Sequence, residues 1–381
     1  MNPLPYLHTL YLLVASDLKT TLLPATVFAL VASISGDLLT SASPVHQINS
    51  QAGLHSHDGH HQLPSLTFHM STFLPNIARS IAWTLINLLI FNLANQRLPN
   101  SILEDQLNKP YRAIPSGRLS PVAARHLLLW LIPLSLCLSH FVLGARNEAM
   151  LLMVATWAYN DLAAGDEHFF IRHLLNALGF TTFGAGAAAV AIGTSRTLNT
   201  STYQWLTFIA IAITFTMQFQ DMEDQEGDSL RDRKTMPLVI GDALTRKINT
   251  VVIMVFSIAA PAFWRLSWWG YVVQVMLGSW IAARSWTRER GVKRDKVTFR
   301  LWCLWLMALY LLPLALGKGV LEGMWWLNGH CSLPWRHNQR RLSTLRTAKS
   351  FGVVMSPFTS SLEWHCHTRW PYTWAFVFIT M

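Results

Sequence analysis

The segment "QFQDMEDQEGDSLRDRKTMPL", residues 218–238, carries three aspartates whose spacing suits metal chemistry: Asp221, Asp224 and Asp228. The spacing i, i+3, i+7 predicts that all three carboxylates lie on one face of a helix. Like charges this close repel one another. A bound Mg²⁺ would relieve the repulsion, because it prefers hard oxygen ligands and phosphate groups. The alternative is a solvated helix end, in which the aspartates pair with the basic residues that follow them.

A second polar cluster occupies residues 91–121, "FNLANQRLPNSILEDQLNKPYRAIPSGRLSP". The residues of this cluster that could bind a polyanion or its metal ion are Asn92, Asn95, Glu104, Asp105, Lys109, Arg112 and Arg118. The alternative is an ordinary loop whose basic residues only reflect membrane topology. However, an even number of expected membrane spans separates the two clusters, so both must face the same side of a membrane. We therefore expect one shared polyanion site built from both clusters.

The composition indicates what kind of protein positions these clusters. Among 381 residues, 51% are hydrophobic and 13% are charged, and the mean hydropathy is +0.28. This balance excludes an ordinary soluble protein and is typical of a multispanning membrane protein. The net charge of +10 could suggest nucleic-acid binding, but basic residues also collect in the cytoplasmic loops of membrane proteins. We expect a lipid bilayer as the partner, and no nucleic acid.

A membrane-spanning helix needs about 20 mainly apolar residues, and the sequence offers nine candidates. They are residues 21–42, 72–94, 121–143, 148–164, 173–194, 203–220, 248–268, 269–287 and 298–324. The predicted fold class is therefore all-α, a multispanning membrane bundle of about nine helices. The loops after the even-numbered spans hold most of the Lys and Arg residues. This asymmetry predicts that these loops, and the shared polar site, face the cytosol.

Two regions do not fit the bundle. Residues 45–69 form a polar insert with six histidines. A histidine-rich tract can bind metal, but no carboxylate or cysteine repeats at ligand spacing, so an irregular loop is the preferred interpretation. Residues 328–381 form a basic tail to which the sequence assigns no role. The membrane domain is therefore predicted to span residues 1–327.

The two clusters resemble the aspartate-rich motifs of the UbiA superfamily of intramembrane prenyltransferases. The run "NKPYRAIPSGR" in the first cluster and the Asp-x-x-Asp-x-x-x-Asp spacing in the second carry the resemblance. It implies a UbiA-like helical bundle, with residues 1–327 as the catalytic domain, in which Mg²⁺ ions join the acids to the diphosphate of an isoprenyl substrate. The implied catalytic and metal-binding residues are Glu104, Asp105, Asp221, Asp224 and Asp228. The implied diphosphate ligands are Asn92, Asn95, Lys109, Arg112, Arg118 and Lys234.

The first cluster departs from the superfamily's usual aspartates, because only Asp105 keeps an aspartate where the motif has one. Asn95, Gln96 and Glu104 stand in the earlier part of the motif. This departure resembles a fungal branch that contains membrane-bound terpene cyclases, and it implies cyclisation of a farnesyl or longer diphosphate. Prenyl transfer to an aromatic or other acceptor is the alternative. A non-catalytic transporter is a third hypothesis, which the scarcity of charge within the spans disfavours.

Aromatic residues on the expected spans offer material for a pocket that shields a carbocation. The candidates are Trp157, Tyr159, Phe180, Phe183, Trp205, Phe219 and Tyr310. Each of them, taken singly, fits core packing better than catalysis. Gly179, Gly184 and Gly186 are expected to allow close helix packing rather than to touch a ligand. The expected setting is the endoplasmic reticulum membrane with the site facing the cytosol, and nothing in the sequence identifies a protein partner.

Overall fold

The computed structural model describes residues 4–43, 70–287 and 291–316. The polar insert at 45–69, the tail at 328–381 and the predicted domain boundary lie outside the described residues. The α-helices are α1 (Leu4–Val14), α2 (Leu23–Ile34), α4 (Met70–Gln96), α5 (Pro99–Asn108), α6 (Pro121–Leu138), α7 (Arg146–Asn160), α8 (Ala164–Glu167), α9 (Phe169–Ile192), α10 (Thr200–Thr216), α11 (Gln218–Leu230), α12 (Met236–Ile240), α13 (Asp242–Phe263), α14 (Trp268–Trp286) and α15 (Val292–Leu311).

Short elements complete the described secondary structure. Two π-helical turns, η1 (Leu18–Leu22) and η3 (Ser139–Leu143), and two 3₁₀ turns, η2 (Gly36–Leu38) and η4 (Leu312–Leu316), flank longer helices. The strands β1 (Thr40–Ala42) and β2 (Arg196–Leu198) pair antiparallel, with Ser41 opposite Thr197. The described part of the chain is therefore a helical bundle with one small strand pair, and the predicted all-α class is confirmed.

Local sequence explains where the important helices begin and end. Pro99 stands at the first turn of α5, where the missing N–H of proline costs no helical hydrogen bond. α4 therefore stops at Gln96, and the first polar cluster starts directly at the end of a long apolar helix. At the start of α10, the Asn199 side chain caps the helix by accepting a hydrogen bond from the Thr202 N–H at 3.0 Å.

Each expected span overlaps a helix, although the first, residues 21–42, also covers η2 and β1. The number of spans stays a prediction. Among the described residues, five helices are long and apolar enough to cross a membrane: Thr72–Gln96, Pro121–Leu143, Phe169–Ile192, Asp242–Phe263 and Val292–Leu316. A sixth crossing results if Tyr6–Val14 and Leu18–Ile34, which meet at a bend of 63°, cross as one broken span. The remaining candidates correspond to α7, α10 and α14.

Helix α9 lies at the centre of the bundle and belongs to both apolar cores. One core joins α9 with α2, α10 and α13–α15, and the other joins it with α1, α4, α6 and α7. Small residues around Gly186 let other helices approach closely. A Cβ added at Gly186 would lie 2.0 Å from the Trp83 ring of α4. Apolar side chains face outward elsewhere, as lipid contact requires: Trp130 and Phe141 are each 78% exposed.

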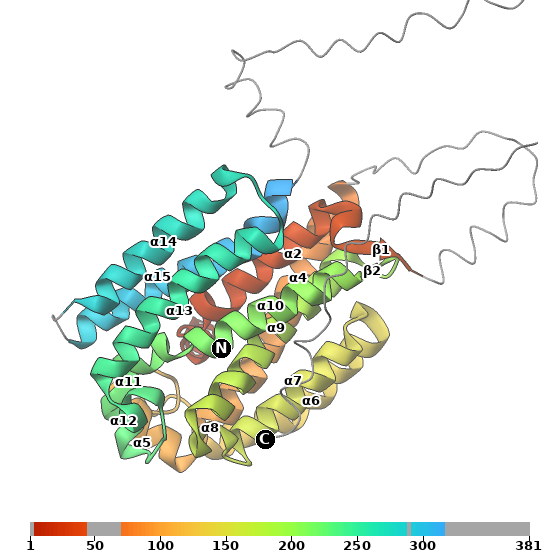
Figure 1. Cartoon of the computed structure of the whole chain (residues 1–381). Coiled ribbons are helices and arrows are strands. Elements are labelled where there is room, and N and C mark those ends of the chain that lie inside the picture. The colour runs from red at the N-terminus through yellow and green to blue at the C-terminus, as the bar shows by residue number, and fades with distance from the viewer. Residues whose placement is uncertain (1–3, 44–69, 288–290, 317–381) are drawn as a thin grey trace, which may run out of the picture. The chain divides into compact units, whose positions relative to one another are not determined.

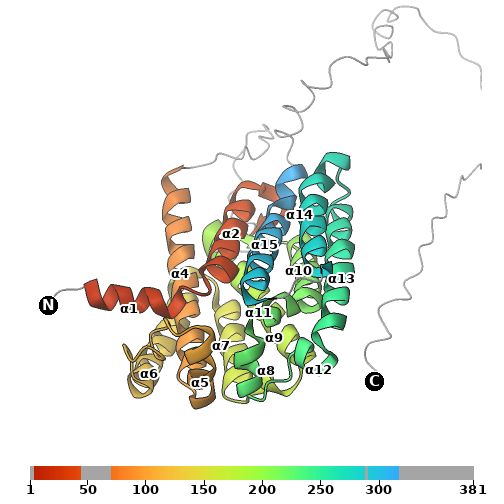
Figure 2. The same cartoon turned by 90° about the vertical axis from the view of Figure 1, so that its left-hand side faces the viewer.

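The two ends of the bundle differ in the elements they carry. Figure 2 shows α5, α8, α11 and α12 gathered at one end of the bundle. Figure 1 shows the β1–β2 pair at the opposite end. Both polar clusters therefore lie at the same end of the described bundle, as the even spacing of spans predicts.

Candidate active site

The two polar clusters meet where α5 packs against α11. The Asn108 side chain at the end of α5 donates a hydrogen bond to the Asp224 carbonyl at 3.2 Å, across 116 positions of sequence. A Cβ added at Gly227 would lie 2.2 Å from the amide nitrogen of Asn108. Glycine at position 227 thus permits the close approach of the two segments. The two clusters lie side by side, as one shared site requires, and the binding of a polyanion there stays a prediction.

The three aspartates of α11 share one buried face, as their spacing predicts. Each of them has a cationic partner. Arg172 of α9 donates to Asp221 at 3.1 and 3.2 Å, and His173 Nε2 lies 3.0 Å from the same carboxylate. Lys109 Nζ lies 3.1 Å from Asp224, and Arg233 lies 2.7 Å from Asp228. In the described residues these cations, rather than a cluster of metal ligands, relieve the repulsion between the aspartates.

The adjacent acids of α5 point to different partners. Asp105 accepts two hydrogen bonds from Arg112 Nη1, at 2.9 and 3.0 Å. Glu104 instead lies 3.0 Å from Arg231 and 2.9 Å from Arg233, both in the segment that follows α11. Glu104 therefore joins the two clusters electrostatically, whereas Asp105 fixes the loop that follows its own helix.

Arg112 also ties the start of the chain to the site. Its Nη2 donates to the Ser16 hydroxyl at 2.8 Å and lies 3.8 Å from the Asp17 carboxylate. Both residues stand in the bend between α1 and η1. The bent N-terminal segment is thereby anchored against the first cluster, and it brings Asp17 into the site.

The surroundings shift the pKa values of these carboxyls in opposite directions. Burial raises the pKa of Glu104, but the nearby Arg233, Lys109 and Arg231 lower it more, so that it falls to about 2. Burial also raises the pKa of Asp221, and Arg172 with His173 again outweighs it, to about 2. At Asp228 burial prevails over the arginines and raises the pKa to about 7. Asp228 Oδ2 is buried and has no hydrogen-bond partner in the described part of the chain.

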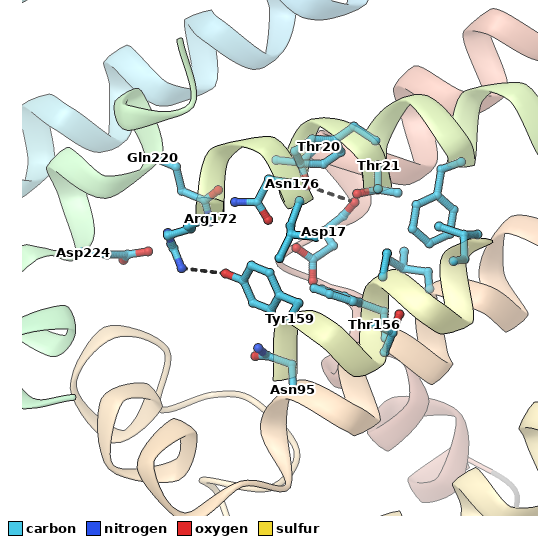
Figure 3. Close-up of a pocket in the computed structure, with 18 of the residues that line it drawn as sticks. Asp17, Thr20, Thr21, Asn95, Thr156, Tyr159, Arg172, Asn176, Gln220 and Asp224 are labelled. Atoms are coloured by element: carbon cyan, nitrogen blue, oxygen red, sulfur yellow. Dashed lines mark hydrogen bonds between the residues drawn. The ribbon is translucent and has the colours of Figure 1, made fainter. Parts of the chain in front are cut away.

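A cavity that is partly open to solvent starts at these ion pairs and extends between the helices. Its polar lining residues are Asp17, Thr20, Thr21, Asn95, Glu104, Lys109, Arg112, Thr156, Tyr159, Arg172, Asn176, Gln220, Asp224 and Arg233. Its other lining residues are Leu88, Phe91, Leu152, Ala155, Leu175, Gly179, Phe180 and Phe183. Figure 3 shows Asp224 and Gln220 on one side, with Asn176 of α9 and Thr156 of α7 around the space. Along α4, α7 and α9 the lining changes from Asn95, Tyr159 and Arg172 near the ion pairs to Leu88, Leu152 and Phe183 farther along these helices. The cavity is therefore charged at one end and apolar at the other.

Tyr159 of α7 lies where the charged and apolar linings meet. Arg172 Nη1 donates a hydrogen bond to the Tyr159 hydroxyl oxygen at 2.6 Å (Figure 3). The Tyr159 ring contacts Phe91 of α4, with ring centroids 6.0 Å apart. The hydrogen bond and the ring contact hold the aromatic ring beside the cationic end of the cavity.

A second, more polar cavity adjoins the first. The two share Asp17, Thr20, Lys109, Gln220 and Asp224 in their walls. The second cavity adds three cations: Lys19 of η1, and Lys296 and Arg300 of α15. The charged end of the site is therefore flanked by additional polar space on the side of η1 and α15.

The structure separates the predicted ligands into three groups. Asn95, Glu104, Lys109, Arg112 and Asp224 line the first cavity. Asn92, Asp105, Asp221 and Asp228 are buried but do not line it. Arg118 and Lys234 are exposed and line neither cavity. The geometry therefore does not bring the last two residues to the site, although their role as diphosphate ligands is a prediction that the structure alone does not test.

Asn92 and Asn95 have different surroundings although both come from the end of α4. The Asn92 amide donates to the Leu88 carbonyl at 3.1 Å, and its oxygen accepts from Gln96 at 3.2 Å. Asn95 reaches the cavity wall and donates to the Asn160 side chain at 2.9 Å. The side-chain amide of Asn92 thus forms its hydrogen bonds within its own helix. Asn95 is the residue of this pair whose amide faces the site.

The sequence analysis missed Arg172 and Asp17 as site residues. Arg172 was counted only among loop cations, which basic residues at the cytosolic side normally are. A signal existed for Asp17, because an acid between two apolar helical segments is expensive in a membrane unless it serves a site. Of the aromatic candidates, Tyr159, Phe180 and Phe183 line the cavity. Trp205 is buried in an apolar core.

Comparison with known proteins gives a consistent result. The chain matches the UbiA prenyltransferase family over residues 74–304. Somaliensene A/B synthase of Streptomyces somaliensis is 27% identical, over 77% of this chain and 88% of its own. Diterpene cyclase eriG of Hericium erinaceus is 28% identical, over 67% of this chain and 79% of its own. Fumagillin beta-trans-bergamotene synthase af520 of Aspergillus fumigatus is 25% identical, over 69% of this chain and 77% of its own.

Proposed function

Because the chain belongs to the UbiA prenyltransferase family, we propose that it ionises a farnesyl or longer isoprenyl diphosphate and cyclises the carbocation to a terpene. The observation that carries the proposal is the division of the cavity into a cationic end and an apolar end. An isoprenyl diphosphate has the same division, with a polyanionic head on a hydrocarbon chain. The relatives named as synthases and a cyclase support cyclisation as the fate of the carbocation.

The cationic end supplies donors for the diphosphate. Lys109, Arg112, Arg172 and Arg233 line this end of the cavity. Arginine and lysine bind phosphate oxygens through charge-assisted hydrogen bonds, and donors held in place stabilise the charge that grows on a leaving diphosphate. We therefore propose Arg172 and Arg233 as diphosphate ligands, in addition to Lys109 and Arg112, because they line the cavity and Arg118 and Lys234 do not.

Mg²⁺ fits the chemistry of the acids at this end. Asp224 and Glu104 line the cavity and offer hard oxygen ligands. Asp228 has a buried carboxylate oxygen without a hydrogen-bond partner in the described residues. We expect Asp224 and Glu104 to hold the metal together with the diphosphate oxygens, with Asp228, Asp221 and Asp105 positioning the surrounding arginines. When bound, Mg²⁺ would neutralise negative charge on the departing diphosphate.

The apolar end protects the carbocation from water. Phe91, Phe180 and Phe183 line it, and Tyr159 stands at its border with the charged end. Aromatic faces attract cations by about 0.5–2 kcal/mol each, and more where water is absent. An enclosed apolar wall also keeps water from quenching a reactive intermediate. These residues therefore give the carbocation time to rearrange within the cavity.

Prenyl transfer to an acceptor is the second candidate function, and the adjoining polar cavity favours it. That cavity shares Lys109 and Asp224 with the first, so an acceptor held there would lie beside the expected diphosphate. The name of the UbiA prenyltransferase family also refers to the transfer of a prenyl group. The two candidates differ in a simple respect, since only the transferase needs a second organic substrate.

Membranes containing the protein should be incubated with Mg²⁺ and farnesyl or geranylgeranyl diphosphate, without acceptor. We expect pyrophosphate release and a cyclic hydrocarbon detectable by gas chromatography with mass spectrometry. Membranes with the Asp224→Asn variant are the control for other enzymes in the preparation. Turnover only after a phenolic acceptor is added would select the transferase, and no pyrophosphate under either condition would refute both.

We further propose that the site faces the cytosol from the endoplasmic reticulum membrane. The basis is the excess of basic residues in the loops at the end that carries α5 and α11. A cysteine is placed at Glu226, which is exposed on α11. In cells whose plasma membrane alone has been permeabilised, this cysteine should react with a membrane-impermeant maleimide. Labelling only after the endoplasmic reticulum membrane is also opened would reverse the orientation.

A further inference from the structure

Gly179 lies on the wall of the first cavity, in the middle of α9. The residues of α9 that line the cavity follow one helical face: Arg172, Leu175, Asn176, Gly179, Phe180 and Phe183. Apart from its chain neighbours and the backbone of its own helix, a Cβ built at Gly179 would meet no described atom within 4 Å. The position therefore faces open space, and the space it faces is the cavity.

The other glycines of the same helix behave differently. A Cβ at Gly186 would lie 2.0 Å from the Trp83 ring, and a Cβ at Gly184 would lie 3.4 Å from the Tyr310 hydroxyl. These two positions face packed side chains, as the sequence analysis expects of all three. For Gly179 that expectation is wrong, because no described helix packs against the position.

An unpacked glycine in a helix interior needs a reason. Glycine is a poor helix former compared with alanine, because it loses more backbone freedom on folding. No described neighbour at position 179 excludes a larger side chain. What the glycine does provide is volume inside the cavity, and that volume is useful only to something that enters it.

The position along the helix indicates which part of a ligand uses this volume. Gly179 follows Arg172 by seven residues, which corresponds to roughly 10 Å along a helix axis. Arg172 belongs to the cationic end, where the diphosphate is expected. Gly179 therefore stands beside the hydrocarbon chain, next to Phe180 and before Phe183 at the apolar end.

We propose that Gly179 determines which isoprenoid chain length the cavity accepts. This inference rests on the proposed function, since it takes the ligand to be an isoprenyl diphosphate. A side chain at position 179 narrows the apolar part of the cavity and leaves the cationic part unchanged. Longer chains, which must pass or fold beside this position, are excluded first, whereas short chains still fit.

The test compares Gly179→Leu and Gly179→Ala with the matched control Gly184→Ala, which adds a methyl group on the same helix but outside the cavity. Pyrophosphate release is measured with geranyl, farnesyl and geranylgeranyl diphosphate. For Gly179→Leu we expect kcat/KM for the longest chain accepted by the unaltered protein to fall at least about tenfold relative to the shortest. Gly179→Ala should show a smaller change in the same direction, and Gly184→Ala should keep the original ratio.

A binding measurement separates this inference from the proposed function. Thermal unfolding is followed in detergent with unreactive thiolo-diphosphate analogues of the same three chain lengths. If the unaltered protein releases no pyrophosphate but Gly179→Leu selectively loses stabilisation by the long analogue, the function is refuted and the inference stands. Equal losses for all chain lengths, or an unchanged length preference in both Gly179 variants, would overturn the inference. Gly179→Ala carries the test if the leucine variant does not fold.

Discussion

The acidic segments α5 and α11 contribute to the same site in different ways. On α11, three aspartates at helical spacing share one face, and all three are buried. On α5, the acids are adjacent in sequence, and helical geometry turns them apart. Asp105 pairs with Arg112, seven positions later, while Glu104 pairs with Arg231 and Arg233 beyond α11.

This difference shows that the role of an acidic residue does not follow from whether it is Asp or Glu, or from whether it matches the family motif. Asp105 is the residue that keeps an aspartate of the family motif, yet it fixes a loop and does not line the cavity. Glu104 is the departure from that motif, yet it lines the cavity and connects the two clusters. The comparison predicts that Glu104 matters more for assembly of the site than its neighbour does.

The substitution Glu104→Gln should have the largest effect. It removes one carboxylate from two buried arginines, so that Arg231 keeps Asp166, and Arg233 keeps Asp166 and Asp228. A buried charge left unpaired costs about 3–5 kcal/mol, and the remaining carboxylates reduce that cost here. We expect a lower unfolding temperature in detergent and little activity. Asp105→Asn is the matched control, because it removes the carboxylate partner of one arginine rather than of two, and Arg112 keeps Ser16 and Asp17. An equal loss in both variants would contradict the comparison.

The substitution Asp224→Asn should abolish most turnover while the protein stays folded. Asp224 is the α11 aspartate that lines the cavity, and the amide keeps its shape but not its charge. Loss of one preorganised electrostatic group typically lowers kcat by about 10²–10³-fold. Pyrophosphate release with saturating Mg²⁺ measures the loss. Glu226→Gln, on the exposed side of the same helix, should leave the rate unchanged, and full activity in Asp224→Asn would refute the metal site.

The substitution Gly227→Ala tests the contact between the two segments. The added methyl group would overlap the Asn108 side chain, and overpacking of this kind costs about 1–3 kcal/mol. Adding Asn108→Ala removes the clash, so the double variant should recover part of the lost stability. Thermal unfolding of the two single variants and the double variant forms a complete cycle. Simple additivity of the two losses would show that the segments do not meet at this point.

The smallest effects are expected for Arg118→Ala and Lys234→Ala. Both side chains are exposed and line neither cavity, and such substitutions usually change stability by less than about 0.5 kcal/mol. Arg172→Ala, which removes a buried cation from the cavity wall, is the contrasting variant and should lose most activity. If Arg118→Ala or Lys234→Ala raises KM for the diphosphate as strongly as Arg172→Ala does, the sequence-based assignment is correct and the geometric one fails.

Regular patterns made part of this molecule predictable. The period of the helix places Asp221, Asp224 and Asp228 on one face whatever their surroundings. Proline at position 99 ends α4 at the expected place. The expected even number of spans between the clusters predicts that α5 and α11 lie at the same end of the bundle, where the structure has them. Each of these inferences depends on local geometry or on topology, which a single sequence contains.

Long-range pairing made the rest unpredictable. Arg172 has no sequence feature that separates it from other loop cations, and only the packing of α9 against α11 brings it to Asp221. Arg118 and Lys234 have the residue types of phosphate ligands, but their loops carry them to the surface. Phe180 lines the cavity whereas Trp205, another aromatic residue on an expected span, fills an apolar core. The orientation of each helix decides these cases.

Arg233 contacts three carboxylates from three helices, Glu104 and Asp166 at 2.9 Å and Asp228 at 2.7 Å. The protein therefore carries its own counter-ions, which hold the acids together when no divalent ion is supplied. After a chelator has removed divalent ions, the protein is expected to stay folded but inactive, and to regain turnover when Mg²⁺ is added back. Purification in EDTA is thus compatible with later assay, and irreversible loss after such treatment would mean that the metal also has a structural role.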